Sequence, residues 1–494
     1  MMRRTLLIYA LSLTIFSPAT AQSGSLALEK LKTELEALRN DSEMAHASWG
    51  ICVMQPESRN TILEYNSSMS LAPASTQKII TTAAGLSILG PSFSYTTRLE
   101  YDGSFDSING VLNGNLYIKG SGDPSLESFF FKDGKDTVKL VDKWADFLKT
   151  KNIRSISGSV VADASVFEDE STESNWAWGD MENYYGAGAS GLSYKDDMYS
   201  LFFNSGKAND SARLIRISPE IPGFSILNYV KAYGTEDEAY IYGAPYTTSR
   251  YITGTIPPNK SNFEVKGALP DPSFLLAYDL KNALSRKKVP VNGPATSVRE
   301  LKLNHRYNPQ TRKEIGKFGS PSLEKIVYWT NMFSVNLFAE HIMKTIALTK
   351  RGFGSSTGGI DEIAKFWKSK GIDIKGMALF DGCGLARANT VTARQLTEIL
   401  CYMTRDRAYL SFFNSLPVAG KTGTMKGLLK GTSAENNLRA KSGSFNRVRS
   451  FAGYVNSKNG QQLAFALIAN NFDYSSNEMR KKLERIMELI SELD

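Results

Sequence analysis

The two ends of this 494-residue chain carry secondary-structure patterns that complete each other, and this is the strongest constraint on its fold. Near the N-terminus, a helical pattern and two strand patterns precede an apolar helix that starts near Ala74. Near the C-terminus, three strand patterns follow one another, and a helix with a capping box at Ser475 and Glu478 closes the chain. The strand patterns cover residues 49–54, 61–65, 439–441, 449–455 and 463–470. We therefore expect one α/β domain built from both chain ends.

The material between these ends follows a different pattern. From about residue 97 to 298, short strand patterns alternate with turns and glycine-rich segments, and an aromatic and acidic stretch at 176–186 interrupts them. Neither an internal repeat nor a low-complexity linker marks this region, so we expect a large, mainly β-rich folded insert. The expected division is 22–98 and 300–494 for the two-ended domain, with the insert at 99–299.

The first 21 residues have the pattern of a secretory signal peptide. Arg3 and Arg4 precede an apolar run over 6–16, and Ala19-Thr20-Ala21 supplies a small-x-small cleavage site. The run is too short to span a bilayer, so we expect an exported chain with no transmembrane anchor. A retained N-terminal anchor is the alternative. The compartment would be the periplasm in a Gram-negative source, and otherwise the cell wall or the medium.

Charge and cysteine content exclude some function classes. The formal net charge of +8 falls to +6 without Arg3 and Arg4, and the basic residues are dispersed. Weak attraction to anionic envelope polymers is therefore expected, and nucleic-acid binding is not. Cys52, Cys383 and Cys401 form no disulfide framework. They allow one disulfide with one thiol left over, or three buried free cysteines, which we favour.

A serine and a lysine three residues apart open the apolar helix near Ala74. Ser75 and Lys78 lie on one helical face, so their side chains can meet. Free backbone N–H groups at a helix start stabilise an oxyanion that forms beside the serine. A lysine held partly neutral by burial can accept the serine proton. The pair is a candidate nucleophile and base.

Two further motifs follow in the same order as in penicillin-binding proteins and class A β-lactamases, which combine Ser-x-x-Lys, Ser-Asp-Asn and Lys-Thr-Gly. Ser334-Val335-Asn336 precedes a helical pattern, and Lys441-Ser442-Gly443-Ser444 opens the C-terminal strands. Lys421-Thr422-Gly423 matches the third motif letter for letter, but its surroundings indicate a loop. In this motif the lysine must be presented along an edge strand. Lys441 opens a strand pattern and Lys421 does not, so we favour Lys441.

These motifs resemble those of the low-molecular-mass class C penicillin-binding proteins, the D-alanyl-D-alanine carboxypeptidase/endopeptidase family of peptidase family S13. The resemblance spans the mature chain and includes Gly122-Asp123-Pro124, Tyr184-Tyr185-Gly186-Ala187 and Asp381-Gly382-Cys383-Gly384-Leu385. It implies a serine β-lactamase/D,D-peptidase (transpeptidase-like) domain whose insert consists of two domains, one nested in the other. Val335 and Cys383 depart from the family, which usually has Asp and Ser there.

The resemblance also implies roles for individual residues. Ser75 would be acylated by stem peptides or by β-lactams, with Lys78 as base and Ser334 passing the proton to the leaving amine. The implied substrate contacts are Asn336, Lys441, Ser442, Gly443 and Ser444, the last through its backbone N–H. Asp163 and Arg387 would hold the amine and carboxylate of a diaminopimelate side chain.

The expected function is thus a serine-type D-alanyl-D-alanine carboxypeptidase or endopeptidase whose partners are peptidoglycan peptides and β-lactams. A serine β-lactamase, and a non-hydrolytic peptidoglycan-binding or penicillin-sensing protein, are the alternatives. We expect no metal and no cofactor, because the three histidines, His46, His305 and His341, lack ligand spacing. Whether the chain forms a homodimer stays open.

Overall fold

A five-stranded antiparallel sheet joins the two ends of the chain. The computed structural model describes residues 19–132 and 138–494, and it gives this sheet the strand order β18-β19-β20-β1-β2. The strands are β1 (Ser48–Met54), β2 (Thr61–Tyr65), β18 (Arg439–Phe445), β19 (Val448–Asn456) and β20 (Gln462–Asn470). All of β1 pairs with β20. The strands expected at both chain ends are confirmed, and so is their union in one α/β domain.

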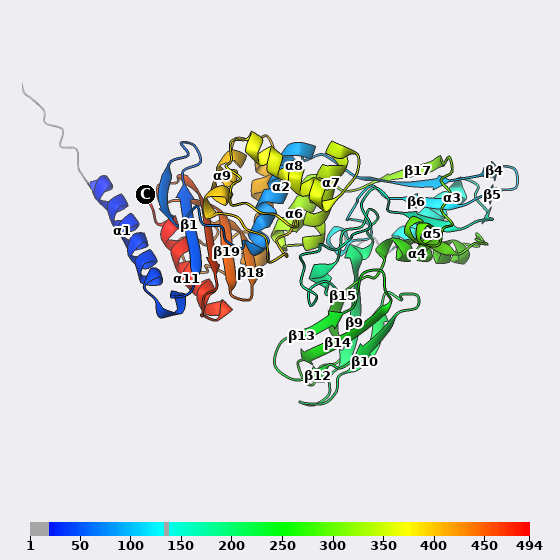
Figure 1. Cartoon of the computed structure of the whole chain (residues 1–494), viewed down its shortest axis with the longest axis horizontal. Helices are drawn as coiled ribbons and strands as arrows, with labels where there is room; N and C mark the ends of the chain where they lie inside the picture. The colour runs from blue at the N-terminus through cyan, green and yellow to red at the C-terminus, as the bar shows by residue number, and fades with distance from the viewer. Residues whose placement is uncertain (1–18, 133–137) are drawn as a thin grey trace, which may run out of the picture.

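Two helices cover one face of this sheet, α1 (Ala19–Arg39) and α11 (Ser476–Ser491) (Figure 1). The apolar side chains that the sequence places on one stripe of each helix are buried against the sheet. They are Leu31, Leu35 and Leu38 of α1 with Met479, Leu483 and Ile486 of α11. The capping box of Ser475 and Glu478 is confirmed. The helical pattern expected near the N-terminus is therefore confirmed as α1.

Six helices pack on the other face of the sheet and on one another. They are α2 (Lys78–Leu89), α6 (Leu323–Met332), α7 (Asn336–Arg351), α8 (Ser356–Ser369), α9 (Ala393–Met403) and α10 (Tyr409–Ser415). Helix α2 is apolar on nearly all sides, and every residue from Lys78 to Leu86 is buried. A helix of that composition is stable only at the centre of a domain. This central position fixes the segment that precedes it.

A second sheet belongs to the middle of the chain and has the order β16-β8-β6-β3-β17. Its strands are β3 (Thr96–Tyr101), β6 (Leu116–Lys119), β8 (Val160–Asp163), β16 (Ala295–Ser297) and β17 (Lys313–Gly319). A small sheet of β4 (Ser104–Asp106), β5 (Val111–Asn113) and β7 (Ser155–Ile156) lies beside it, with helix α5 (Val298–Leu303). Because β17 pairs with β3, hydrogen bonding extends this sheet beyond the expected insert limit at residue 299. The domain limits themselves stay a prediction.

Two helices in the middle region were not expected. Helices α3 (Leu140–Thr150) and α4 (Pro272–Arg286) pack on each other, and both contribute to the core of the second sheet. Val141, Trp144, Ala145 and Leu148 recur at helical spacing and are buried. The interpretation of the region as strands and turns alone was wrong at this point, because this periodicity was overlooked.

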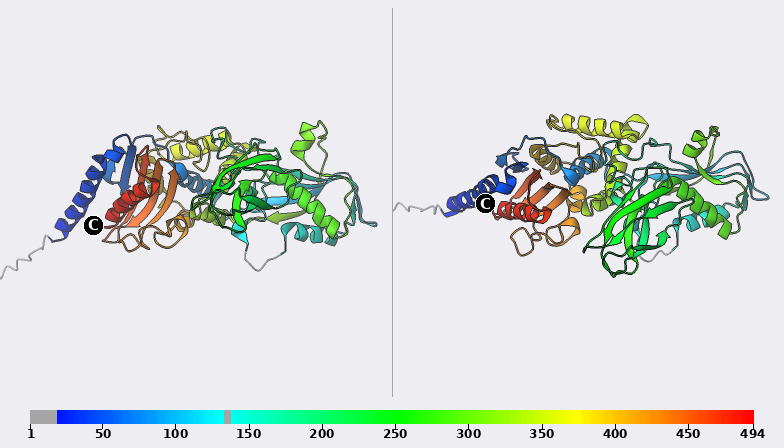
Figure 2. Two further views of the ribbon diagram at one scale, coloured as in Figure 1. Left: turned by 90° about the horizontal axis from the view of Figure 1, so that it is seen from below. Right: turned by 60° about the horizontal axis from the view of Figure 1, so that its bottom comes forward.

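A third unit, all β, lies within the middle region at residues 198–268. One sheet consists of β9 (Met198–Asn204), β10 (Arg213–Ser218) and β15 (Phe263–Ala268). The other consists of β11 (Ser225–Asn228), β12 (Lys231–Ala232), β13 (Glu238–Tyr242) and β14 (Ser249–Ile256). Figures 1 and 2 show these strands as a lobe that projects from the long body of the molecule.

The expected signal peptide lies almost entirely outside the described residues, since only residues 19–21 of it are described, at the start of α1. Within the described ranges, none of the helices is both long enough and apolar enough to cross a membrane.

Candidate active site

Ser75 lies on a single 3₁₀ turn, Ala74–Gln77, that continues directly into α2. The expected helix start is correct in position, but its first turn is tighter than an α-helix. Ala74 adopts a positive φ of 46°, a conformation that costs a residue with a Cβ about 1–3 kcal/mol. The buried helix α2 holds this strained turn in place, and Ser75 is left half-buried at the edge of a cleft.

Lys78 is fully buried behind Ser75. Its ammonium nitrogen lies 3.1 Å from the Ser75 hydroxyl, 2.6 Å from Asn336 Oδ1 and 2.8 Å from the Cys383 carbonyl. Burial lowers the pKa of Lys78, although the nearby Cys383, Asp381 and Glu340 act in the opposite direction. A lysine in this state can exchange a proton with the serine beside it.

A second serine and lysine pair faces the first. Lys441 on β18 donates to Ser334 Oγ at 2.9 Å and to the Ser442 carbonyl at 2.7 Å. Burial, together with the charge of Lys78, holds the pKa of Lys441 well below its usual range. Ser334 lies in the turn between α6 and α7 with a positive φ of 60°. The two buried lysines are thus close enough to influence each other.

Asn336 ties this centre to the insert. It is the first residue of α7, and its side-chain amide nitrogen donates to the Tyr185 carbonyl at 2.7 Å while its oxygen accepts from Lys78. Tyr185 belongs to the aromatic and acidic stretch at 176–186. The residue between the two polar positions, Val335, packs against the helical core.

Strand β18 is the edge of its sheet and passes directly beside the serine turn. A Cβ at Gly443 would lie 2.3 Å from Ser450 Oγ, 2.6 Å from the Pro73 carbonyl oxygen and 2.9 Å from the Ser75 nitrogen. Real Cβ contacts are longer than this, so only glycine fits here. The absence of a side chain at Gly443 therefore sets the separation between the edge strand and the turn that carries Ser75.

The competing Lys421 lies elsewhere. It is exposed in a turn that is held by the Thr422 hydroxyl, which accepts from the Val418 backbone N–H at 2.9 Å. Lys441, by contrast, is buried and contacts Ser334. The structure brings together Ser75, Lys78, Ser334, Asn336 and Lys441, and it leaves Lys421 outside this group.

A cleft of about 2,110 Å³ opens over Ser75, Ser334, Asn336 and Ser444. Its walls come from the two-ended domain, from the stretch at 176–186 and from the β-rich lobe. Such a large trough, lined by residues of several units, accommodates an extended polymer more readily than a small metabolite.

The structure separates Asp163 from Arg387. Asp163 is buried at the end of β8, where it accepts from Ser165 and forms an ion pair of 2.5 Å with Arg312. Burial raises the pKa of Asp163, but these contacts outweigh burial and the pKa is lowered. Arg387 is exposed in the cleft, and its nearest acidic partner is Asp180, at 3.8 Å. Sequence reasoning missed Asp180, although the acidic stretch containing it stood out.

Asp381 organises the loop behind Lys78. Its two oxygens accept five N–H groups, from the side chains of Gln77, Asn389 and Trp176 and from the backbone of Gly384 and Ala386. This loop also supplies the Cys383 carbonyl that holds Lys78. Asp381 therefore positions the loop that holds Lys78, and Trp176 connects it to the insert.

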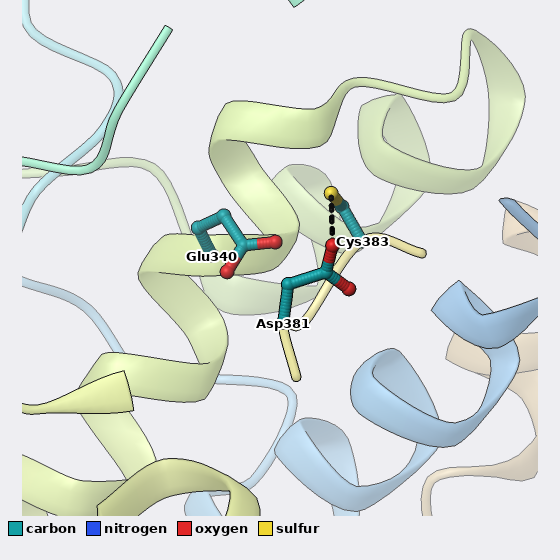
Figure 3. A group of neighbouring side chains, drawn as sticks. All are labelled: Glu340, Asp381 and Cys383. Carbon is teal, nitrogen blue, oxygen red and sulfur yellow. Dashed lines mark hydrogen bonds between the residues drawn. The ribbon is translucent and has the colours of Figure 1, made fainter. Parts of the chain in front are cut away.

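Glu340, Asp381 and Cys383 converge on one point in the described part of the chain, as Figure 3 shows. Such a group of donors can hold a metal ion, but here both oxygens of Asp381 and of Glu340 already accept N–H groups. Burial raises the pKa of Glu340 and of Cys383, so both groups favour their protonated forms. The donor set is typical of a buried hydrogen-bond network. Cys52, Cys383 and Cys401 are all buried free thiols.

Residues 31–493 match the sequence model of the family described as D-Ala-D-Ala carboxypeptidase 3 (S13). The D-alanyl-D-alanine carboxypeptidase of Actinomadura sp. (strain R39) is 25% identical over 92% of this chain and 83% of its own length. The D-alanyl-D-alanine carboxypeptidase DacB of Haemophilus influenzae is 24% identical over 86% of this chain and 85% of its own.

A solved structure has the same fold. The crystal structure of penicillin binding protein 4 (dacB) from Haemophilus influenzae superposes with a TM-score of 0.76 at 21% identity, over 93% of this chain and 97% of that one. A complex of the same protein with a β-lactam superposes with a TM-score of 0.70 at 20% identity. The expected fold class is confirmed.

Proposed function

The chain belongs to the D-Ala-D-Ala carboxypeptidase 3 (S13) family, and we propose that it hydrolyses the D-alanyl-D-alanine end of peptidoglycan stem peptides, and their crosslinks, through an acyl-enzyme on Ser75. The observation that carries the residue assignment is the meeting of two serine and lysine pairs, Ser75 with Lys78 and Ser334 with Lys441, at the bottom of one cleft.

In the proposed acylation, neutral Lys78 takes the Ser75 proton while Oγ attacks the carbonyl carbon of the penultimate D-alanine. Backbone N–H groups of Ser75 and Ser444 stabilise the oxyanion. The C–N bond then breaks, and the departing amine receives a proton through Ser334. Water later cleaves the ester and regenerates Ser75. The lowered pKa values of Lys78 and Lys441 support this route, because a base must be neutral to accept a proton.

Substrate binding follows from the edge strand. Past Ala440, β18 has no strand partner except β19 among the described residues, so an extended peptide can lie along Ser442, Gly443 and Ser444. Lys441 and the Ser442 hydroxyl would hold the terminal carboxylate, and Asn336 the peptide amide. A β-lactam would acylate Ser75 in the same position, which the β-lactam complex of the similar Haemophilus protein supports.

For the third residue of the stem peptide, we replace the expected pair of Asp163 and Arg387 by Asp180 and Arg387. These two opposite charges line the same cleft 3.8 Å apart, so a side chain with an amine and a carboxylate could bind between them. Asp180→Asn should slow cleavage of stems with a free diaminopimelate side-chain amine about tenfold and spare stems in which that amine is acetylated. Asp163→Asn is the matched control, and an equal effect of both substitutions would refute the replacement.

The decisive experiment is intact-protein mass spectrometry after brief exposure to benzylpenicillin, on wild type and Ser75→Ala. A stable adduct on the wild type alone supports the proposal. Rapid loss of the adduct, with release of hydrolysed penicillin, would indicate a β-lactamase, and no adduct would indicate a non-hydrolytic binder.

We also propose that the chain is exported, because its polymer substrate lies outside the cytoplasm. The signal pattern over residues 1–21 supports this location.

A further inference from the structure

Aromatic side chains gather on one exposed sheet face of the β-rich lobe. The face is formed by β11 and its continuation into β12, by β14 and by β13, where side chains alternate strictly between two sides. The inward side chains are buried in the core. The large hydrophobic side chains on the outward side are tyrosines, together with one leucine, and they lie among serines, threonines, Lys231 and Glu238. They are Leu227 (63% exposed), Tyr229 (60%), Tyr240 (45%), Tyr251 (37%) and Tyr233 (62%).

Strand register arranges these side chains in rows across the sheet. The first row consists of Leu227, Tyr251 and Tyr242. The two tyrosine rings are stacked, with their centroids 4.9 Å apart and an angle of 10° between their planes. Tyr240 pairs with Thr253 in the next row, and Tyr229 on the far strand donates its backbone N–H to the carbonyl of Ile252, the residue before Thr253. We call this surface, Leu227, Tyr229, Tyr240, Tyr242 and Tyr251, the tyrosine face. Contiguous exposed apolar patches rimmed by polar residues mark interaction sites or ligand-binding grooves.

The tyrosine face is continuous with the active-site cleft. Tyr240 and Tyr242 line that cleft together with Ser75. Tyr242 lies within van der Waals distance of a Cβ built at Gly179, in the cleft wall. Tyr185 lines the same cleft as Tyr240, and burial together with Asp180 raises its pKa. Tyr185 in turn holds Asn336.

We propose that the tyrosine face binds the glycan strand of peptidoglycan, so that the sugar polymer lies on the lobe while one of its stem peptides enters the cleft. This inference rests on the proposed function and extends it from the peptide to the polymer. A pyranose ring has an apolar C–H face and a rim of hydroxyl and amide groups. A tyrosine offers a matching apolar ring with a polar tip, and threonines such as Thr253 and Thr255 lie between the rings.

One feature of the substrate favours a glycan over a protein partner. The stem peptide is covalently attached to the glycan, so any stem that reaches Ser75 brings a sugar strand to the mouth of the same cleft.

The test uses the mature full chain and the double variant Tyr229→Ser/Tyr251→Ser, which leaves the cleft residues intact. The matched control is Ile215→Ser on β10, 40% exposed in the other sheet of the same lobe. Binding is measured by isothermal titration calorimetry with soluble glycan strands, from which an amidase has removed the stem peptides. We expect about tenfold weaker binding for the double variant, or about 1.4 kcal/mol, and no change for the control.

Catalysis provides the second readout. The double variant should cleave intact crosslinked sacculi more slowly, while its benzylpenicillin acylation rate and its activity on a soluble crosslinked muropeptide stay at wild-type values. Unchanged binding to peptide-free glycan would overturn the inference, and so would loss of self-association in the double variant, which would identify a second copy as the partner. If the wild type shows neither acylation nor muropeptide cleavage, the proposed function fails instead, irrespective of glycan binding.

Discussion

Gly443→Ala should impair acylation far more than it impairs stability. The new methyl group would have to sit 2.3 Å from Ser450 Oγ, 2.6 Å from the Pro73 carbonyl oxygen and 2.9 Å from the Ser75 nitrogen. The Ser450 hydroxyl can rotate away, but the other two atoms belong to the backbone of the nucleophile turn. To reach ordinary contact at 3.4 Å or more, the Ser75 nitrogen must move by about 0.5 Å and the Pro73 oxygen by about 0.8 Å.

Overpacking of this kind typically costs about 1–3 kcal/mol of stability, which the large two-ended domain can tolerate. Catalysis is less tolerant, because a displacement of about 1 Å between reacting groups can cost about 100-fold in rate. We therefore expect the second-order rate constant for benzylpenicillin acylation to fall by about two orders of magnitude, while thermal unfolding shifts by only a few degrees.

The assay is the rate of adduct formation followed by mass spectrometry, with a thermal melt of the same sample. Gly427→Ala is the matched control, because a Cβ there meets nothing within 4 Å, and it should acylate as the wild type does. A Gly443→Ala variant that acylates at the wild-type rate would refute the view that this glycine sets the distance between strand and nucleophile.

Three further outcomes are expected. Because burial lowers the pKa of Lys78, acylation by benzylpenicillin should accelerate as the pH rises and Lys78 loses its proton; a rate that falls with pH would contradict a role as base. Asp381→Asn places an amide donor opposite N–H groups that now bond to a carboxylate oxygen. It should lower the free energy of unfolding, measured by chemical denaturation, by about 2–4 kcal/mol and also slow acylation. An unchanged unfolding free energy and an unchanged acylation rate would exclude the positioning role. Burial raises the pKa of Asp197 to about 8, above its unfolded value near 4, so its contribution to stability is present at acidic pH and is lost between about pH 4 and pH 8. Asp197→Asn should flatten the decline of unfolding free energy in that window, and equal slopes for variant and wild type would contradict the assignment.

The sequence predicted most of the two-ended domain, because its elements depend on local periodicity. The terminal capping box, the alternating strands and the apolar helix after Ser75 all follow from side-chain spacing. The helices α3 and α4 show the limit of this reasoning. Their periodicity is present, but it lies within a region of short strands and turns, where it was overlooked.

The candidate site also has residues that the sequence could predict and residues that only the tertiary structure brings together. Ser75 and Lys78 are three residues apart on one turn, so their proximity follows from helix geometry alone, and order and context identified Ser334, Asn336 and Lys441. Asp163 and Asp180 could not be told apart in this manner, since both are acidic residues of the insert. Only the packing of the 176–186 stretch against the two-ended domain, through Trp176 and Asp381, brings Asp180 to Arg387.

The sequence by itself therefore predicted the family, the enzyme class and the pair that we propose as nucleophile and base, because these are encoded in short motifs with local geometry. The tertiary structure decided which lysine of two is buried beside Ser334, which aspartate faces the cleft and where the tyrosine face meets it. These features depend on contacts between segments that are hundreds of residues apart, and such contacts are fixed by packing of the whole chain, not by the spacing of neighbouring side chains.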